Sequence, residues 1–200
     1  MTKEPSAEEV VVATRTWLER AVIGLNLCPF AKPVHVNNLI RYFVSEARLP
    51  ARLLEDLMAE LRALDAADPE QCETTLLIHP HVLADFSDYN EFLEQADDAV
   101  SELGLEGVIQ VASFHPRYRF EDAGSDDIEN YTNRSPYPML HLLLESSVER
   151  AVTTYPDTTA IYRRNIETLR RLGHEGWRGL WLAEVPHDER IHRRGRGGKT

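Results

Sequence analysis

The segment TTLLIHPH, residues 74–81, has the pattern of a central strand around which the other elements of the chain pack. Its first five residues are almost wholly apolar, which is typical of a short strand with both faces covered. Pro80 ends the strand, because proline cannot donate the backbone hydrogen bond that a central strand requires. Histidines stand on both sides of that proline. The segment therefore predicts a central strand that ends in ionisable side chains.

Strands and helices alternate on both sides of this segment. Apolar spacing predicts a helix over 7–23, a strand over 39–44, a helix over 50–65, a strand over 74–78, a helix from a cap at Asp88 to Gly104, a strand over 108–114, a helix opened by Pro138, a helix over 158–172 capped by Asp157, and either a helix or an edge strand over 177–185. This order favours parallel strands joined by right-handed crossovers. We expect an α/β fold, with α+β as the alternative: a small, mostly parallel sheet of three to four strands with about five helices packed on it.

The carboxyl ends of the predicted strands bring ionisable residues to one edge of the sheet. Parallel strands end at the same edge, and ligands of open α/β sheets bind there. The residues that directly follow the three strands include Glu46, His79, His81, His115 and Arg117. We expect a site at this edge, provided that the middle strand runs parallel to the other two.

A long polar stretch follows the third predicted strand. It reads FHPRYRFEDAGSDDIENYTNRSPYP, residues 114–138, and connections of roughly 20 or more residues are usually functional or disordered. Its aromatic residues distinguish it from a disordered segment. Arginines suit bidentate binding of carboxylate or phosphate, although they also pair with neighbouring acids. Besides Glu46 and His81, the predicted substrate-binding residues are Arg117, Arg119, Tyr131, Asn133 and Arg134.

The predicted catalytic residues are Cys28, His79 and His115. Cys28 lies in the apolar segment NLCPF, residues 26–30. A cysteine becomes a nucleophile when a histidine within reach favours its thiolate. The alternative is an inert cysteine, since free cysteine is among the most buried residue types.

Three histidines make a metal site an alternative use of the same edge. His79, His81 and His115 would supply three imidazoles, a number that suits zinc, iron or copper. No zinc-type ligand spacing is present, and histidines at strand ends also cap neighbouring backbone groups. We therefore assign no metal ligand and leave the cofactor open.

Composition and charge limit the class of protein. A net charge of −11 argues against nucleic-acid binding, which typically uses a basic surface. No apolar run approaches the ~18 residues that span a membrane, and the first residues lack the apolar core of a signal peptide. The two cysteines suit a reducing compartment. We expect a soluble cytoplasmic protein, free of membrane, with one α/β domain over residues 7–185 and a disordered basic tail over 186–200. The oligomeric state stays open.

Four segments of the chain carry a family resemblance. They are GLNLCPFAKPV (24–34), TLLIHPHVLADFSDYNEFL (75–93), GVIQVASFHPRYRFEDAGSDDIENYTNRSPYPMLHLL (107–143) and the arginine-rich helix before Gly173. Together they resemble a bacterial and plant family catalogued as domain of unknown function 1415. The resemblance covers residues 10–182 and implies a single-domain soluble protein. It brings no activity, cofactor or catalytic residue.

The residues favour an enzyme that acts on a small anionic substrate, a carboxylate or a phosphate. In this hypothesis Cys28 or a histidine does nucleophilic or acid–base work, and the arginines orient the anion. The alternative is a non-catalytic module that binds a metabolite or a metal through His79, His81 and His115. A third interpretation is a structural loop that presents a protein interface.

Overall fold

Within the residues that the structure describes, four strands form one mixed sheet in the order β1-β2-β4-β3. They are β1 (Ile40–Val44), β2 (Thr74–Ile78), β3 (Ile109–Phe114) and β4 (Met139–Leu144). β1 and β2 pair in parallel, whereas β4 lies between β2 and β3 and pairs antiparallel with both. β1, β2 and β3 therefore run in one direction. The computed structural model confirms the predicted fold class, but the sheet is mixed rather than mostly parallel.

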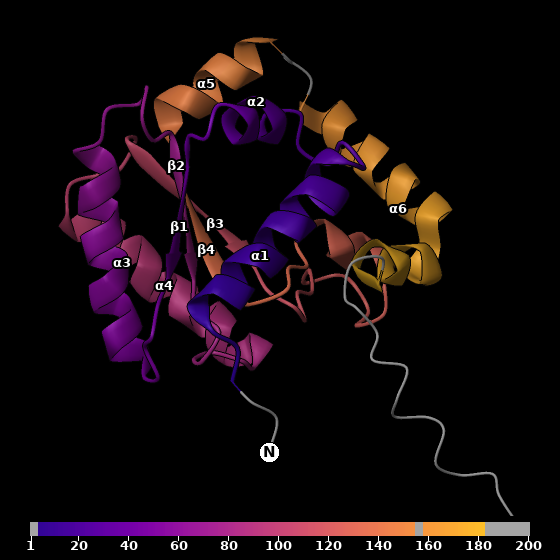
Figure 1. Ribbon diagram of the computed structural model, residues 1–200, viewed down its shortest axis with the longest axis horizontal. Helices are drawn as coiled ribbons and strands as arrows, with labels where there is room; N and C mark the ends of the chain where they lie inside the picture. Colours follow the sequence, from indigo (N-terminus) through magenta and orange to yellow (C-terminus); the bar gives the residue numbers. More distant parts are fainter. Residues whose placement is uncertain (1–3, 155–157, 183–200) are drawn as a thin grey trace, which may run out of the picture.

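Helices cover both faces of the sheet (Figure 1). In the residues that the structure describes, 4–154 and 158–182, they are α1 (Ala7–Trp17), the π-helix η1 (Leu18–Ile23), α2 (Ala31–Val36), α3 (Pro50–Asp65), α4 (Phe86–Glu102), the 3-10 helix η2 (Ile128–Thr132), α5 (Glu145–Thr154) and α6 (Thr158–Leu182). α3 and α4 lie on one side of the sheet, and α1 and α6 lie on the other. None of these helices is both long and apolar enough to cross a membrane.

The helix predicted to begin at Pro138 is wrong: residues Met139–Leu144 form the strand β4. Its sequence, MLHLLL, is rich in leucine and methionine, which favour helices where local propensity is the only guide. Both faces of β4 are covered by helices, so the strand needs no polar face. Leu140 and Leu142 pack on the side of α3 and α4, and Met139 packs on the side of α1 and α6. A helix does follow, but it begins at Glu145.

The side chains of β2 alternate between two hydrophobic clusters. Leu77 packs with α3 and α4, whereas Leu76 and Ile78 pack with α1 and α6. Leu77 and Ile78 are fully buried, and burying such a side chain contributes about 1.5–3 kcal/mol. Because successive side chains of a strand point to opposite faces, the residue after Ile78 returns to the side of α3 and α4. This alternation places His79.

Local signals set the first turns of the helices. Ser6 and Glu9 form the predicted capping box of α1. Pro50 begins α3, where its fixed backbone angle suits the first turn. α4 begins earlier than predicted, because Asp85, and not Asp88, is its cap. The Asp85 side chain accepts a hydrogen bond from a backbone N–H of the first turn.

The last helix continues beyond its predicted end. α6 reaches Leu182 across a kink at Gly173, whose φ of 66° and ψ of 175° suit glycine alone. The segment 177–185, for which the sequence left helix and strand open, is helical up to Leu182. The predicted cap Asp157 and the predicted tail 186–200 lie outside the described residues.

Candidate functional site

The three strands that run in one direction deliver their following residues to one edge of the sheet. β4 begins at this edge, since it runs the opposite way. The backbone N–H of Ser45 donates to the carbonyl of Ile78 at 2.8 Å, and that of His79 donates to Pro138 at 3.0 Å. The polar stretch therefore leaves β3 and enters β4 at the edge where β1 and β2 end. The condition that the middle strand runs parallel to the others is met.

A buried aromatic group occupies this edge on the side of α3 and α4. His79 and His115 are fully buried, and their rings lie 5.8 Å and 5.0 Å from the ring of Tyr89 in α4. The Tyr89 hydroxyl donates to the carbonyl of Met139 at 2.8 Å and accepts from the N–H of Phe114 at 3.1 Å. Tyr89 thus ties the end of β3 to the start of β4.

Both histidines bind the loop between β2 and α4. Nδ1 of His79 lies 3.0 Å from the carbonyl oxygen of Val82, and Nε2 of His115 lies 3.2 Å from that of Leu83. A carbonyl only accepts, so each of these nitrogens carries a proton and donates. Leu83 has a positive φ of 57°, a conformation that typically costs about 1–3 kcal/mol and needs support from its surroundings. The histidines supply that support.

Arg117 continues this pattern to the next carbonyl. Its Nη2 donates to the carbonyl of Ala84 at 2.5 Å and lies 3.3 Å from the Asp85 carboxylate, the cap of α4. Three consecutive carbonyls are therefore held by His79, His115 and Arg117, which we call the carbonyl clamp. The clamp fixes the start of α4 relative to the sheet edge.

The two clamp histidines are neutral at pH 7. Burial lowers the pKa of His79 to about 4 and also lowers the pKa of His115. Nδ1 of His115 accepts the N–H of Arg117 at 3.0 Å. Of the four ring nitrogens, the buried Nε2 of His79 is the one without a hydrogen bond to any described residue. In the described part of the chain, no three His, Cys, Asp or Glu residues are grouped to hold a metal.

His81 and Glu46 lie nearby but outside the clamp. Nε2 of His81 is 4.0 Å from the Glu46 carboxylate, which is exposed. His81 and Glu46 follow β2 and β1 at the same edge of the sheet as the clamp.

Cys28 lies on the opposite side of the sheet from the histidines. It follows η1, is half-buried, and packs with the cluster of α1 and α6. Burial raises the pKa of its thiol, which disfavours the thiolate. The structure therefore does not bring Cys28 together with His79 and His115.

The polar stretch is ordered by its own amides. Asn130 is fully buried; its Nδ2 donates to the carbonyl of Gly124 at 2.8 Å, and its Oδ1 accepts the N–H of Phe120 at 3.0 Å. Asn133 donates to the carbonyl of Ser113 at 3.1 Å. Asn133, predicted to bind substrate, thus holds the stretch against β3.

The arginines of the stretch form no ion pair with its acidic residues within the described ranges. Arg117 pairs with Asp85, outside the stretch. Arg119 is exposed and contacts no partner among the described residues. Arg134 donates to two carbonyls, that of Tyr118 at 3.3 Å and that of Ser125 at 2.6 Å. Internal pairing with the acids therefore does not account for these charges.

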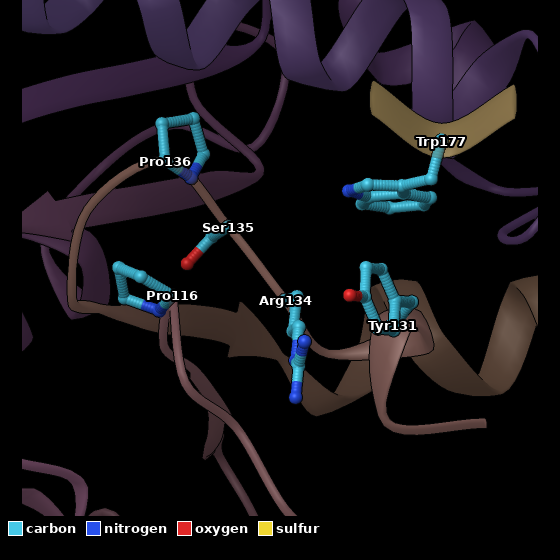
Figure 2. A pocket seen from close by; sticks show the side chains of 6 residues that line it. All are labelled: Pro116, Tyr131, Arg134, Ser135, Pro136 and Trp177. Carbon is cyan, nitrogen blue, oxygen red and sulfur yellow. The ribbon is translucent and has the colours of Figure 1, made fainter. Parts of the chain in front are cut away.

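A pocket of about 440 Å³ surrounds Arg134 (Figure 2). We call it the Arg134 pocket; it is lined by Pro116, Tyr131, Arg134, Ser135, Pro136 and Trp177. The Arg134 guanidinium lies 4.1 Å from the centre of the Tyr131 ring, and the Tyr131 hydroxyl is 3.2 Å from Nδ1 of His174. Trp177 reaches the pocket from the part of α6 beyond the kink.

Sequence reasoning identified two of the lining residues, Tyr131 and Arg134. It missed the prolines, Ser135 and Trp177, which carry no ionisable group. It also missed Tyr89, although a tyrosine on the buried stripe of a helix usually needs a partner for its hydroxyl. That requirement was the available signal.

A family model described as a protein of unknown function (DUF1415) matches residues 9–179. The chain belongs to this family. The resemblance inferred from the sequence is thereby confirmed. No curated protein and no solved structure matches the chain.

The extent of the family match includes both features of the sheet edge. Residues 9–179 contain the carbonyl clamp, the whole polar stretch and Trp177. The family description states no activity, so the chemistry of the site has to be inferred from its geometry.

Proposed function

We propose that the protein binds a small anionic molecule in the Arg134 pocket. The observation that carries this proposal is the guanidinium of Arg134, which lines an open pocket without a carboxylate partner among the described residues. An arginine fork is the side chain best suited to bidentate binding of carboxylate or phosphate. Arg134 differs from the exposed Arg119 of the same stretch in that it lines a pocket and is held there by backbone carbonyls.

The geometry of Arg134 supports binding with little reorganisation. Two backbone carbonyls and the face of Tyr131 hold the guanidinium from three directions. The carbonyl of Arg134 itself accepts the indole N–H of Trp17 at 2.9 Å, which anchors this residue to α1. A group that is already fixed loses little conformational freedom when a ligand binds.

Anion binding is the part of the enzyme hypothesis that receives most support. A thiolate mechanism has less, because Cys28 has a raised pKa and packs in the other layer. A metal-binding module has less too, since three of the four ring nitrogens of the clamp histidines are engaged by the backbone. Since His79, His115 and Arg117 each donate to a backbone carbonyl of the loop before α4, we assign them a structural role at this edge of the sheet.

Ligand-dependent thermal stability tests the proposal. Acetate, benzoate and inorganic phosphate are titrated at constant ionic strength, with chloride as the balancing ion. At least one of them should raise the Tm of the wild type and of Arg119→Gln, but not that of Arg134→Gln. Arg119 is the matched control, as an exposed arginine of the same stretch. A ligand at ten times its Kd stabilises the folded state by about 1.4 kcal/mol.

The result that overturns the proposal is also specific. Equal anion-dependent stabilisation in Arg134→Gln and wild type would place binding elsewhere. Absence of stabilisation by all three anions would remove the proposed function.

A further inference from the structure

We propose that the anion bound by the Arg134 pocket is a monocarboxylate attached to a flat apolar ring, that is, an aryl carboxylate. This inference rests on the proposed function and narrows its ligand class. Three properties of the pocket carry it: the free donors of the guanidinium, the single positive charge, and the flat walls.

The free donors of Arg134 suit a carboxylate. A guanidinium carries five N–H groups, and here Nε and Nη2 donate to the carbonyls of Tyr118 and Ser125. Nη1 and the second hydrogen of Nη2 form no hydrogen bond within the described residues. These two nitrogens make up the end of the fork, where two parallel N–H groups match the two oxygens of a carboxylate.

The charge of the pocket matches one negative charge. Arg134 is the one cationic residue among the six that line it. The two hydroxyls of the lining have partners, since Ser135 donates to the carbonyl of Tyr137 and the Tyr131 hydroxyl lies against His174. A phosphate dianion would leave one of its charges and most of its acceptor oxygens without a partner. A monocarboxylate leaves neither.

The walls of the pocket are flat and apolar. Figure 2 shows Pro116 and Pro136 on one side of Arg134, and Tyr131 with Trp177 on the other. The rings of Tyr131 and Trp177 meet edge to face, with centroids 5.1 Å apart. Planar rings pack favourably against such surfaces, and a volume of about 440 Å³ falls in the usual range for small-molecule sites. Because the Arg134 guanidinium covers the face of Tyr131, the ring of the ligand lies on the proline side of the guanidinium, against Pro116 and Pro136.

Four matched probes test this assignment by calorimetry at constant ionic strength. Acetate carries the carboxylate without the ring, benzamide carries the ring without the charge, and benzoate carries both; inorganic phosphate tests the charge. We expect benzoate to bind about tenfold or more tightly than acetate, because the ring is buried against apolar walls. Benzamide and phosphate should both bind more weakly than benzoate.

Two variants assign the contributions to the two parts of the pocket. Arg134→Gln should abolish the advantage of benzoate over benzamide. Pro116→Ala should weaken benzoate binding more than acetate binding, and so lower the advantage of benzoate over acetate. If Arg134→Gln does not fold, the ranking of the four probes on the wild type still decides the question.

The outcomes separate this inference from the proposed function. Acetate or phosphate binding as tightly as benzoate, and depending on Arg134, would overturn the aryl carboxylate and leave anion binding intact. Equal binding of benzoate and benzamide would show that the charge is not recognised, and both would fall. Failure of every anion to bind would also overturn both.

Discussion

The carbonyl clamp and the Arg134 pocket stand at the same edge of the sheet, and residues of the polar stretch contribute to both. In the clamp, two buried histidines and the exposed Arg117 donate their hydrogen bonds to the backbone carbonyls of the loop before α4. In the pocket, the backbone holds an arginine that lines the cavity and keeps N–H donors without a hydrogen bond among the described residues. Ionisable residue types at a strand end therefore do not distinguish residues that support the fold from residues that bind a ligand. Their remaining hydrogen-bonding capacity does.

Acid should produce the largest effect, because it protonates two histidines that are neutral in the folded chain, the fully buried His79 and the partly buried His141. An unfolded histidine has a pKa near 6.5, whereas burial lowers the pKa of His79 and of His141 to about 4. As the pH falls from 6.5 to 4, the unfolded chain binds protons that the folded chain excludes. Stability is complete above about pH 6.5 and is lost below it, by up to about 3 kcal/mol per histidine.

Urea unfolding from about pH 7 to about pH 4.5 measures this loss. His79→Gln should show a shallower pH dependence than the wild type, and His141 should account for part of what remains. An unfolding free energy that stays constant over this range would contradict the burial of neutral histidines.

Tyr89→Phe should cost about 2–3 kcal/mol, because it leaves the Met139 carbonyl and the Phe114 N–H without their partner in a buried place. The ring contacts with the histidines are retained. Tyr118→Phe is the matched control; its ring also contacts Phe86, and we expect a change within about 0.5 kcal/mol. Chemical denaturation compares the two variants. Equal effects would deny that Tyr89 ties β3 to β4.

Gly173→Ala should cost about 1–3 kcal/mol, since its backbone angles are strained for any residue with a Cβ. It should also weaken anion binding, because the kink carries Trp177 to the Arg134 pocket. Gly179→Ala lies in the same helix, where a Cβ would meet no atom within 4 Å. It should be neutral or slightly stabilising. Similar Tm values for the two variants would contradict the role of the kink.

Arg117→Gln should have the smallest effect, about 0.5–1 kcal/mol, because the side chain is exposed and loses one carbonyl bond and a surface ion pair. Anion-dependent stabilisation should be unchanged. Loss of that stabilisation in Arg117→Gln would show that Arg117 binds the anion, and the clamp and the pocket would then not differ in role.

The sequence predicted those elements whose ends carry their own signals. Thr74–Ile78 and Pro50–Asp65 have the predicted bounds, since a strand followed by a histidine–proline turn and a helix opened by proline are locally determined. The helix predicted where β4 lies was wrong, because an apolar run covered on both faces has no periodicity that separates a strand from a helix. Only its pairing with β2 and β3 decides between them.

The sequence predicted where the site residues lie better than it predicted what each of them does. Strand direction was enough to gather His79 and His115 at one edge. Whether Cys28 faces them depends on which side of the sheet each element packs, and residue types do not encode that. Trp177 reaches Tyr131 through the kink at Gly173, a contact between segments more than forty positions apart that no local pattern contains.

The position of β4 has a consequence for how the chain acquires its sheet. Among the strands of the described residues, β4 is synthesised last, yet it lies between β2 and β3. Until residues 139–144 emerge, β3 has no neighbouring strand and β2 presents an open, apolar edge, which is prone to wrong pairing. The sheet is therefore completed late, when β4 inserts between β2 and β3 and pairs with both. A chain that stops before residue 139 should aggregate rather than fold into a smaller version of the sheet.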